Sequence, residues 1–277
     1  MNLLPPAINF HINRHCNARC RFCFATFRDV PGLLSLGDAL RTIDLLRAAG
    51  AEKINFAGGE PTLHPQLGAL LRHAHGLGLV TSVVTNGARL ERLLRDHAEV
   101  LDWAGLSVDS GREDVEVALG RSRGVHVAQS IHLADLCRAS GVRVKLNTVV
   151  TTLNAEEELS GLVRRIAPER WKVFQVLPMV GQNDGVVEPL LISAAAFDAF
   201  VRRHEPLRGE GLAPVVEDND TMRGSYAMID PAGRFFGNAT GAHVYSDPIV
   251  AQGVAATLAQ VGFVPHKFEG RGGRYAW

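Results

Sequence analysis

The sequence predicts an α/β fold in which a parallel sheet curves into a partial barrel, followed by a smaller α+β extension. Short apolar runs rich in β-branched residues alternate with stretches whose apolar residues recur at helical spacing. Several runs are almost continuously apolar, as parallel strands are when helices cover the sheet. Six such units in series, joined by right-handed crossovers, predict a partial (β/α)6 barrel that stops short of the eight units of a closed barrel.

The elements of the barrel are expected in strict alternation. The expected strands are residues 7–13, 53–57, 79–85, 103–108, 143–149 and 171–177. The expected helices are residues 36–49, 66–77, 89–100, 125–140 and 155–166. Ser35 and Asn154 are the expected N-caps, because a short polar side chain there can accept a backbone N–H. Gly50, Gly78 and Gly141 stand where helix C-caps are expected.

The alternation fades after Leu177 and a glycine-containing loop follows, so we expect the barrel over residues 1–185 and the extension over residues 186–277. The extension is expected to contain a helix at 193–204, a loop at 206–219, a hairpin formed by 226–229 and 234–236, and a helix at 249–261. The hairpin is indicated by Asp230-Pro231-Ala232-Gly233, which has Pro and Gly in suitable turn positions. A glycine-rich tail follows at residues 270–274.

Composition narrows the class of protein. The 277 residues carry 29 Lys plus Arg against 29 Asp plus Glu, and this neutral balance argues against general binding of DNA or RNA. The first seven residues lack the pattern of a secretion signal. The uncharged stretch between Asp247 and Lys267 has amphipathic helical spacing, unlike a membrane span. We therefore expect a cytoplasmic protein that binds neither nucleic acid nor membrane.

Three of the four cysteines, Cys16, Cys20 and Cys23, form a C-x3-C-x2-C cluster directly after the first strand. Three thiolates on one short loop can bind three irons of a cubane cluster and leave the fourth iron for another ligand. Zinc is the competing interpretation, with His15 as the fourth ligand. The third interpretation is that the cysteines are inert and simply packed. A polar loop that also carries arginines argues against this. From the residues alone, an iron–sulfur site ranks first and a zinc site second.

The same segment resembles the radical S-adenosylmethionine (SAM) enzymes. The cysteine spacing and the aromatic Phe22 match that family's motif, and the second expected strand leads into Gly58-Gly59-Glu60-Pro61, another mark of the family. The resemblance implies a radical SAM barrel, a [4Fe-4S] cluster bound by the three clustered cysteines, and S-adenosylmethionine bound at the open iron. It also implies a set of cofactor-binding positions, which are Phe22, Gly58, Gly59, Glu60, Asn86 and Ser107.

Basic residues on two adjacent expected strands indicate a second site. Lys145 and Asn147 share one face of a strand because strand side chains alternate, and Arg170 and Lys172 share a face of the next strand. Burying an unpaired Lys in an apolar strand is costly, so such a residue usually has a partner or a ligand. Cations gathered on adjacent strands suit a polyphosphate. The alternative is ordinary ion pairing with nearby glutamates, namely Glu157, Glu158 and Glu169.

The order of these segments is similar to that of the viperin family of radical SAM enzymes. The matching segments are residues 16–24, 58–61, 145–147, 154, 170–175, 225–226, 238 and 271–275. The resemblance implies a dehydratase that converts a ribonucleoside triphosphate (CTP, UTP or GTP) to its 3′-deoxy-3′,4′-didehydro analogue, an anti-phage chain terminator. In such an enzyme a 5′-deoxyadenosyl radical takes the C4′ hydrogen, the 3′-hydroxyl leaves as water, and one electron and a proton complete the product.

The resemblance also implies substrate-binding and catalytic positions. Lys145, Arg170, Lys172 and a tail arginine, either Arg271 or Arg274, would bind the triphosphate, and Asn147 would contact the sugar or the phosphates. Asn238 lies in the region that would read the base, and the residues after it depart from the animal form, so the preferred base stays open. Tyr226 is the implied proton donor, the alternative being a packing role in the hairpin. A reductant such as flavodoxin or ferredoxin is the implied protein partner.

Two other functions stay open. A radical SAM cyclase acting on GTP would fit as well, although a molybdenum-cofactor-type cyclase normally carries a second cysteine cluster, and the sequence has none after Cys137. The second open function is a nucleotide sensor that binds zinc or a cluster and has no catalytic activity. Cys137 itself, within an expected helix, reads as a buried small hydrophobe. The N-terminal amphipathic helix and the C-terminal partner interactions of the animal form are not expected here.

Overall fold

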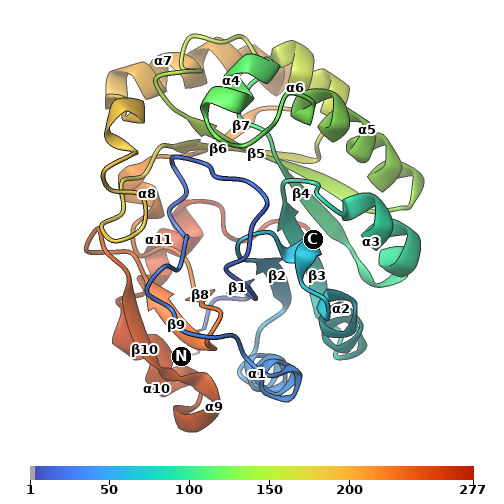
Figure 1. Ribbon diagram of the computed structural model, residues 1–277, viewed down its shortest axis with the longest axis vertical. Helices are drawn as coiled ribbons and strands as arrows, with labels where there is room; N and C mark the ends of the chain where they lie inside the picture. Colours follow the sequence, from blue (N-terminus) through green and yellow to red (C-terminus); the bar gives the residue numbers. More distant parts are fainter. Residues whose placement is uncertain (1–3) are drawn as a thin grey trace.

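A single curved sheet organises the fold in this computed structural model, which describes residues 4–277. Its ten strands run in the order β10-β9-β8-β1-β2-β3-β4-β5-β6-β7 (Figure 1). The strands are β1 (Ala7–His11), β2 (Lys53–Ala57), β3 (Val80–Thr85), β4 (Trp103–Ser107), β5 (Arg143–Val150), β6 (Arg170–Gln175), β7 (Pro214–Glu217), β8 (Met228–Ile229), β9 (Arg234–Gly237) and β10 (Val244–Pro248). The absence of a secretion signal was expected from residues 1–7, and residues 1–3 of this segment lie outside the described residues.

Neighbouring strands from β1 to β7 pair in parallel, and β8 also runs parallel to β1. Only the pairs β8–β9 and β9–β10 in the described chain are antiparallel. Within residues 4–277 no pairing joins β7 to β10, so the sheet curves without closing. The predicted partial barrel is therefore confirmed, and residues after 185 extend it at both edges.

The longer helices lie along the outside of the curved sheet, whereas α8 and α11 lie by the opening between β7 and β8 (Figure 1). The helices of the described chain are α1 (Leu36–Ala48), α2 (Leu67–Gly76), α3 (Leu90–His97), α4 (Glu113–Ala118), α5 (His126–Ala139), α6 (Ser160–Ile166), α7 (Ala194–His204), α8 (Asn219–Met222), α9 (Ile249–Gln252), α10 (Val254–Leu258) and α11 (Pro265–Gly270). Short 3-10 turns occur at Pro61–Leu63, Ala98–Val100, Glu188–Leu190, Glu205–Glu210 and Ala259–Val261. None of the helices within residues 4–277 combines the length and apolarity needed to cross a membrane.

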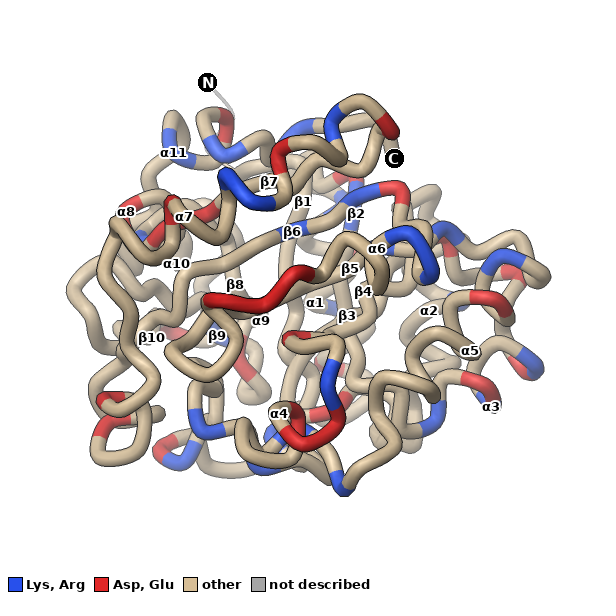
Figure 2. Tube along the Cα trace, turned by 90° about the horizontal axis from the view of Figure 1, so that it is seen from above, with Lys and Arg blue, Asp and Glu red and all other residues tan. Residues whose placement is uncertain are grey.

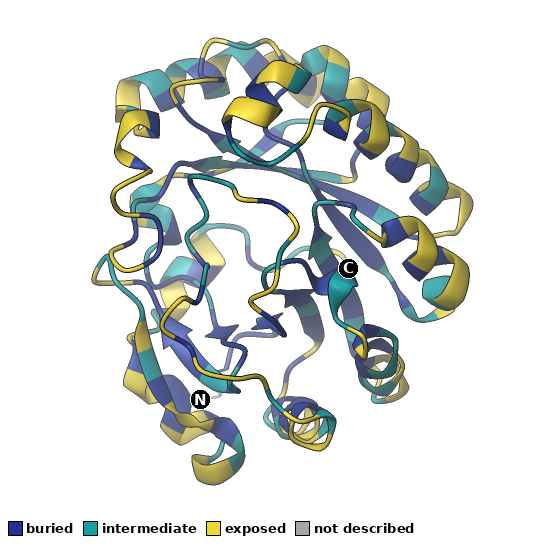
Figure 3. Ribbon diagram, in the orientation of Figure 1, coloured by how far each residue is buried: buried dark blue, intermediate teal, exposed yellow. Residues whose placement is uncertain are grey.

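The two faces of the sheet bury different residues because side chains alternate along each strand. Ile54 and Phe56 of β2, and Val144 and Leu146 of β5, belong to the apolar core between sheet and helices. The intervening residues face the inside of the barrel, where several are polar. Figure 3 shows the central strands largely buried, whereas the helices around them are exposed on their outer sides. The interior of the barrel is therefore the place for a functional site.

Several predicted caps and boundaries differ from the structure. The Ser35 side chain accepts the Asp38 backbone N–H at 3.1 Å, which confirms that N-cap. Asn154 does not cap a helix: its Oδ1 accepts the Thr151 N–H at 2.7 Å in a turn, and α6 begins at Ser160. The expected helix at 249–261 is broken at Gly253, whose φ of +82° interrupts the helical path. The hydrogen bonds of Asn154 and the conformation of Gly253 therefore shorten helices that the apolar periodicity predicted to be longer.

The main error is the loop expected at 206–219. Residues 214–217 form β7, which pairs in parallel with β6 so that Val215 lies beside Lys172. This strand is short and starts with a proline, so its period-2 pattern is too brief to recognise from sequence. Helices α4, α8 and α11 and strand β10 were missed as well; the three helices have six, four and six residues. Such segments are fixed by tertiary packing more than by local pattern.

Candidate active site

The inside of the barrel holds a cavity of about 320 Å³, lined from every strand between β1 and β6 and from the C-terminal segments. Every second residue of a strand faces the cavity, as Lys53, Asn55 and Ala57 of β2 do. The expected site residues that line it are Cys16, Cys20, Phe22, Cys23, Gly58, Gly59, Glu60, Asn86, Ser107, Lys145, Asn147, Arg170, Lys172, Tyr226, Asn238 and Arg271. Arg274 does not line it. Its side chain is 56% exposed and faces Glu52 and Glu269.

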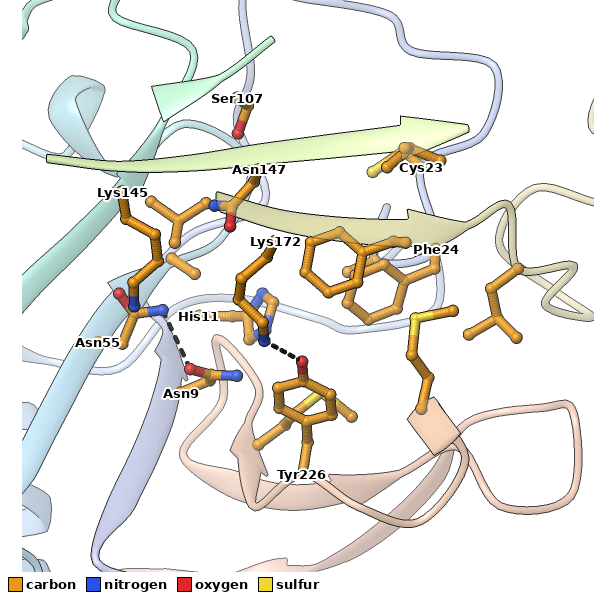
Figure 4. Close-up of a pocket in the computed structure, with 18 of the residues that line it drawn as sticks. Asn9, His11, Cys23, Phe24, Asn55, Ser107, Lys145, Asn147, Lys172 and Tyr226 are labelled. Atoms are coloured by element: carbon orange, nitrogen blue, oxygen red, sulfur yellow. Dashed lines mark hydrogen bonds between the residues drawn. The ribbon is translucent and has the colours of Figure 1, made fainter. Parts of the chain in front are cut away.

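The cavity has two chemically different ends. In Figure 4, Cys23 and Phe24 lie on one side of the view and Lys145 on the other, with Lys172 and Tyr226 between them. The cysteines follow β1 at the carboxyl end of the parallel strands. Lys145 and Arg170 lie near the amino ends of β5 and β6 and stand side by side in the sheet register. A ligand that filled the cavity would reach from thiols to cations.

One side of the cysteine loop (residues 13–23) is fixed by its contact with the segment after β2. The Gly59 N–H donates to the Asn13 carbonyl at 2.7 Å, and the Glu60 N–H donates to the His15 carbonyl at 2.8 Å. A Cβ on Gly59 would lie 2.2 Å from the His15 carbonyl oxygen, and one on Gly58 would lie 2.5 Å from that of Asn13. The two glycines therefore permit a backbone approach that places Cys16 at the cavity.

The other side of the loop is held by the segment after α4, which sequence reasoning missed. The N–H groups of Arg19 and Arg21 donate to the carbonyls of Gly120 and Leu119 at 2.8 and 3.0 Å. Arg121 lines the cavity, with its guanidinium 5.2 Å from the Phe22 ring centroid. Two fully buried carboxylates balance its charge, those of Asp109 and Glu116. A buried ion group of one guanidinium and two carboxylates therefore lies beside the cysteine loop.

The donor set fits an iron–sulfur cluster better than a zinc ion. The thiols of Cys16, Cys20 and Cys23 are free and all reach the same cavity. Burial raises the pKa of all three, that of Cys20 to about 12, so an electropositive ligand such as iron is needed to hold them as thiolates. His15, the fourth ligand of the zinc alternative, is exposed and does not line the cavity. Within residues 4–277 no three His, Cys, Asp or Glu side chains are arranged around one ion position.

Glu60 has a role in the frame of the site that the sequence did not indicate. Its carboxylate is buried and accepts from the Thr62 and Thr85 hydroxyls, each at 2.6 Å, and from the Asn86 N–H at 2.8 Å. These bonds tie the ends of β2 and β3 together. They also orient Asn86, whose Nδ2 lies 3.8 Å from the Cys16 sulfur and 2.9 Å from Asn17 Oδ1. Asn86 thus directs its amide at the thiol end of the cavity.

At the far end, two lysines share the hydroxyl of a tail residue. Lys53 and Lys145 donate to Tyr275 Oη at 2.8 and 2.7 Å, and the Arg170 guanidinium lies 4.1 Å from the Tyr275 ring centroid. Burial lowers the pKa of Lys53 to about 7 and that of Lys145 well below its usual value. Lys53 was missed because it opens a strand, although a Lys in an apolar run is the signal that identified Lys145.

Between the two ends, Lys172 donates to Tyr226 Oη at 2.7 Å (Figure 4). Both are joined to Glu217 of β7, which accepts from Tyr226 and pairs with Lys172. Arg271 lies 3.6 Å from the same carboxylate and stacks on the Tyr226 ring at 3.6 Å from its centroid. The sequence alternative of pairing with Glu157, Glu158 or Glu169 is therefore wrong for Lys172.

The interior carries an excess of positive charge. Figure 2 shows Lys and Arg positions along the central strands as well as over the outside of the molecule. Five basic side chains line this half of the cavity, namely Lys53, Lys145, Arg170, Lys172 and Arg271. Glu217 pairs with two of them, Lys172 and Arg271. Burial and mutual repulsion lower the pKa of Lys172 to about 8, with Glu217 opposing the change. A polyphosphate would neutralise this excess.

Asn238 and Ser107 both line the cavity, but they differ in whether their side chains are available to a ligand. Asn238 is buried, and its Oδ1 accepts the Gly224 N–H at 2.9 Å, so its side chain supports the backbone just before Tyr226. Ser107 lies beside Asn147 in the sheet register. Its carbonyl contacts His126 at 2.7 Å, and its side chain lies at the edge of the cavity (Figure 4). Ser107 can therefore contact a ligand directly, whereas Asn238 is already engaged.

Comparison with known proteins identifies the class to which this fold and site belong. Residues 10–166 match the family model of the radical SAM superfamily. The fold is shared with Streptococcus suis SuiB bound to S-adenosylmethionine, at a TM-score of 0.64 and 16% identity over 83% of this chain and 59% of that one. It is also shared with native anSMEcpe with bound AdoMet, at a TM-score of 0.63 and 16% identity over 84% and 74%. The chain is a radical SAM protein, and this superfamily uses a [4Fe-4S] cluster and S-adenosylmethionine, as expected.

More similar relatives narrow the family. The S-adenosylmethionine-dependent nucleotide dehydratase of Flammeovirga pacifica is 41% identical over 100% of this chain and 97% of its own length. That of Lacinutrix mariniflava is 40% identical, and this chain spans 59% of its length. The RSAD2 protein of Oncorhynchus mykiss is 36% identical over 99% and 81%. The chain belongs to the S-adenosylmethionine-dependent nucleotide dehydratases, which confirms the resemblance to the viperin family.

Proposed function

We propose that this protein is a radical SAM dehydratase that converts a ribonucleoside triphosphate (CTP, UTP or GTP) to its 3′-deoxy-3′,4′-didehydro analogue. The observation that carries the proposal is one cavity that joins three cysteine thiols at one end to five basic side chains at the other, three of them buried lysines. The thiol end suits the source of a radical, and the basic end suits a triphosphate. The sugar of a bound nucleotide would lie between the two ends. The names of the relatives support dehydration as the reaction.

Cys16, Cys20 and Cys23 would hold the cluster, and the surroundings of the cysteine loop would hold SAM. When bound, this pair of cofactors supplies a carbon radical that removes a hydrogen atom from the substrate. The cofactor amino group suits the backbone carbonyls of Gly58 and Gly59, which accept no hydrogen bond from residues 4–277. Asn86, Ser107 and Arg121 suit its carboxylate and ribose, because they present amide, hydroxyl and guanidinium donors at that end.

The cation end would fix the substrate by its phosphates. Lys53, Lys145, Arg170 and Arg271 would bind the triphosphate, and Tyr275 would have to share or release the two lysines that it contacts. The sugar would then lie against Asn147, Lys172 and Tyr226, with Tyr226 as the proton donor. Such placement matters because a reactive radical attacks whichever C–H bond lies closest, and orientation supplies much of the selectivity.

We further propose that an acidic reductant such as flavodoxin or ferredoxin reaches the cluster over the cysteine loop. Arg14, Arg19 and Arg21 lie in the loop and Arg28 follows it, and none of them pairs with a carboxylate among residues 4–277. Unpaired cations at this edge would attract an acidic partner through a field that salt screens. Cluster reduction by flavodoxin should therefore slow as ionic strength rises, and a rate independent of salt would contradict the proposal.

The test of the function offers all four ribonucleoside triphosphates to anaerobically reconstituted protein with SAM and a reductant. Mass spectrometry should find a product lighter than one triphosphate by one water, formed together with 5′-deoxyadenosine. Formation of 5′-deoxyadenosine without any dehydrated nucleotide would overturn the substrate class and favour another radical reaction, such as a GTP cyclisation. Stoichiometric zinc with no cleavage of SAM would favour the sensor instead.

A product of this kind would lack the 3′-hydroxyl that a polymerase extends, so we infer an anti-phage role through chain termination. We also propose a cytoplasmic site of action. The free thiols of the cysteine loop support it, because an oxidising compartment would convert such thiols to disulfides. Infection of cells that express the active protein or its Cys20→Ala variant would test this role. Equal phage yields in the two strains would contradict it.

The two tail arginines provide a matched pair of variants for the triphosphate site. We expect R271A to raise the nucleotide KM by about 10- to 100-fold, because a charge-assisted hydrogen bond is worth about 1.5–3 kcal/mol. We expect R274A to leave KM within about twofold, because its side chain is exposed outside the cavity and exposed ion pairs contribute little. Steady-state dehydration kinetics of both variants would decide. Equal effects would show that the triphosphate does not use the cation end as assigned.

A further inference from the structure

Glu217 is a buried carboxylate that the sequence did not single out and that does not itself line the cavity. It lies on β7, the edge strand at one end of the open sheet, whereas Tyr226 precedes β8 on the other side of the opening. The contact between their side chains therefore spans the unclosed part of the barrel. The connection between them, residues 218–225, is only eight residues long and includes α8.

Glu217 holds three functional groups at once. One oxygen accepts the Tyr226 hydroxyl, and the other pairs with the Lys172 ammonium and lies 3.6 Å from an Arg271 guanidinium nitrogen. Tyr226 Oη also accepts from Lys172, so the phenol, the ammonium and the carboxylate form a closed ring of contacts. Because the carboxylate is fully buried, water does not compete for these partners.

We propose that Glu217 is a positioning residue of the dehydration reaction, which keeps Lys172 protonated and fixes the Tyr226 phenol and the Lys172 ammonium beside the proposed position of the substrate sugar. This inference rests on the proposed function. The departing 3′-hydroxyl needs a proton to leave as water, and a neutral Lys172 could not provide or relay it. Glu217 is the buried anion in contact with Lys172, so it sets the protonation of the group nearest to the proposed position of the sugar.

Electrostatics around Lys172 support this role. Burial and the charges of Arg271 and Arg170 lower its pKa to about 8, although Glu217 acts to raise the pKa by its charge and by a hydrogen bond. Arg271 and Lys172 in turn lower the pKa of Glu217 against the opposing effect of burial, so the carboxylate stays ionised. Tyr226 is held as a phenol, because burial raises its pKa well above the usual value. The wild-type activity should therefore fall as pH rises through about 8.

The test compares pH profiles of turnover at saturating nucleotide for wild type and the isosteric variant E217Q. Removing an opposite charge in contact typically changes a pKa by about 1–3 units, so the alkaline loss of activity should begin about 1–3 pH units lower in E217Q. At pH 8 turnover should fall by at least about fivefold. The nucleotide KM should change much less. The control is E210Q, which removes an exposed carboxylate paired with Arg164 and should keep the wild-type profile.

Two further measurements keep the inference open to refutation if E217Q folds poorly. E217D retains the charge and should restore the wild-type position of the alkaline limb even where turnover is reduced. K172R replaces the titrating group by one that stays charged and should remove that limb. A wild-type profile in E217Q, or an unchanged limb in K172R, would overturn the role of Glu217. If the wild type dehydrates no nucleotide, the proposed function has failed instead, so the two failures are distinguishable.

Discussion

Replacement of Cys20 by alanine should abolish both cleavage of SAM and dehydration of nucleotide. Cys20 lies in the middle of the cysteine loop and reaches the cavity together with Cys16 and Cys23. A [4Fe-4S] cluster with an open iron needs three thiolates, and two leave a second iron without a protein ligand. After anaerobic reconstitution, iron and sulfide per chain should fall to a small fraction of the wild-type content. The nucleotide should still bind, because the cations lie at the other end of the cavity.

The matched control is C137A, which removes the remaining cysteine of the chain. Cys137 is fully buried in α5, does not line the cavity, and packs in the apolar core. Its loss should cost about 1 kcal/mol of stability, as small deletions in a core do, and leave iron content and activity unchanged. Loss of iron in C137A to the same extent as in C20A would contradict the assignment of the cluster to the cysteine loop.

The contrast between these two cysteines shows what the sequence could establish. The thiols in the loop were recognisable because their spacing carries the chemistry, whatever the surrounding fold. Lys145 and Arg170 were recognisable because a cation in a buried strand is costly unless it has a partner or ligand. The structure adds that their register places them side by side. In these cases a local pattern was enough to single out a residue that lines the cavity.

Other parts of the site depend on tertiary structure and left little local signal. Glu217 lies on a four-residue strand that begins with Pro214, so neither length nor alternation marked it. Arg121 follows a six-residue helix that is too short for a clear apolar period. Tyr275 reaches Lys53 only because the tail folds back over the amino ends of β2 and β5. Each of these residues is identified by what it contacts across the barrel.

The sequence also could not decide which of the two tail arginines, Arg271 or Arg274, lies at the cavity. The tail sequence offers both with nearly identical neighbours, and only the fold separates them. Arg271 is packed against the Tyr226 and Phe268 rings with its charge near Glu217. Arg274 points outward to Glu52 and Glu269. A resemblance can therefore indicate a functional tail, and the packing of the tail decides which of its side chains can meet a substrate.

The second large effect is expected from the backbone contact that places the cysteine loop. In Gly59→Ala the new Cβ would lie 2.2 Å from the His15 carbonyl oxygen and 2.6 Å from that of Arg14. These are backbone atoms of the loop, so the loop must move away from β2, and the two hydrogen bonds from Gly59 and Glu60 are lost or lengthened. Overpacking of this kind costs about 1–3 kcal/mol. A shift of about 1 Å in the reacting groups can cost about 100-fold in rate.

We therefore expect G59A to fold, to bind nucleotide, and to lose most of its capacity for cluster assembly or about 100-fold of its turnover. Gly209→Ala is the control, because Gly209 is exposed, has no heavy atom within 4 Å of the added Cβ, and does not need a positive φ. Iron content, SAM cleavage and nucleotide dehydration measured on both variants would test the contact. Wild-type iron and turnover in G59A would show that the cysteine loop tolerates displacement, and that the glycine pair does not position the cluster.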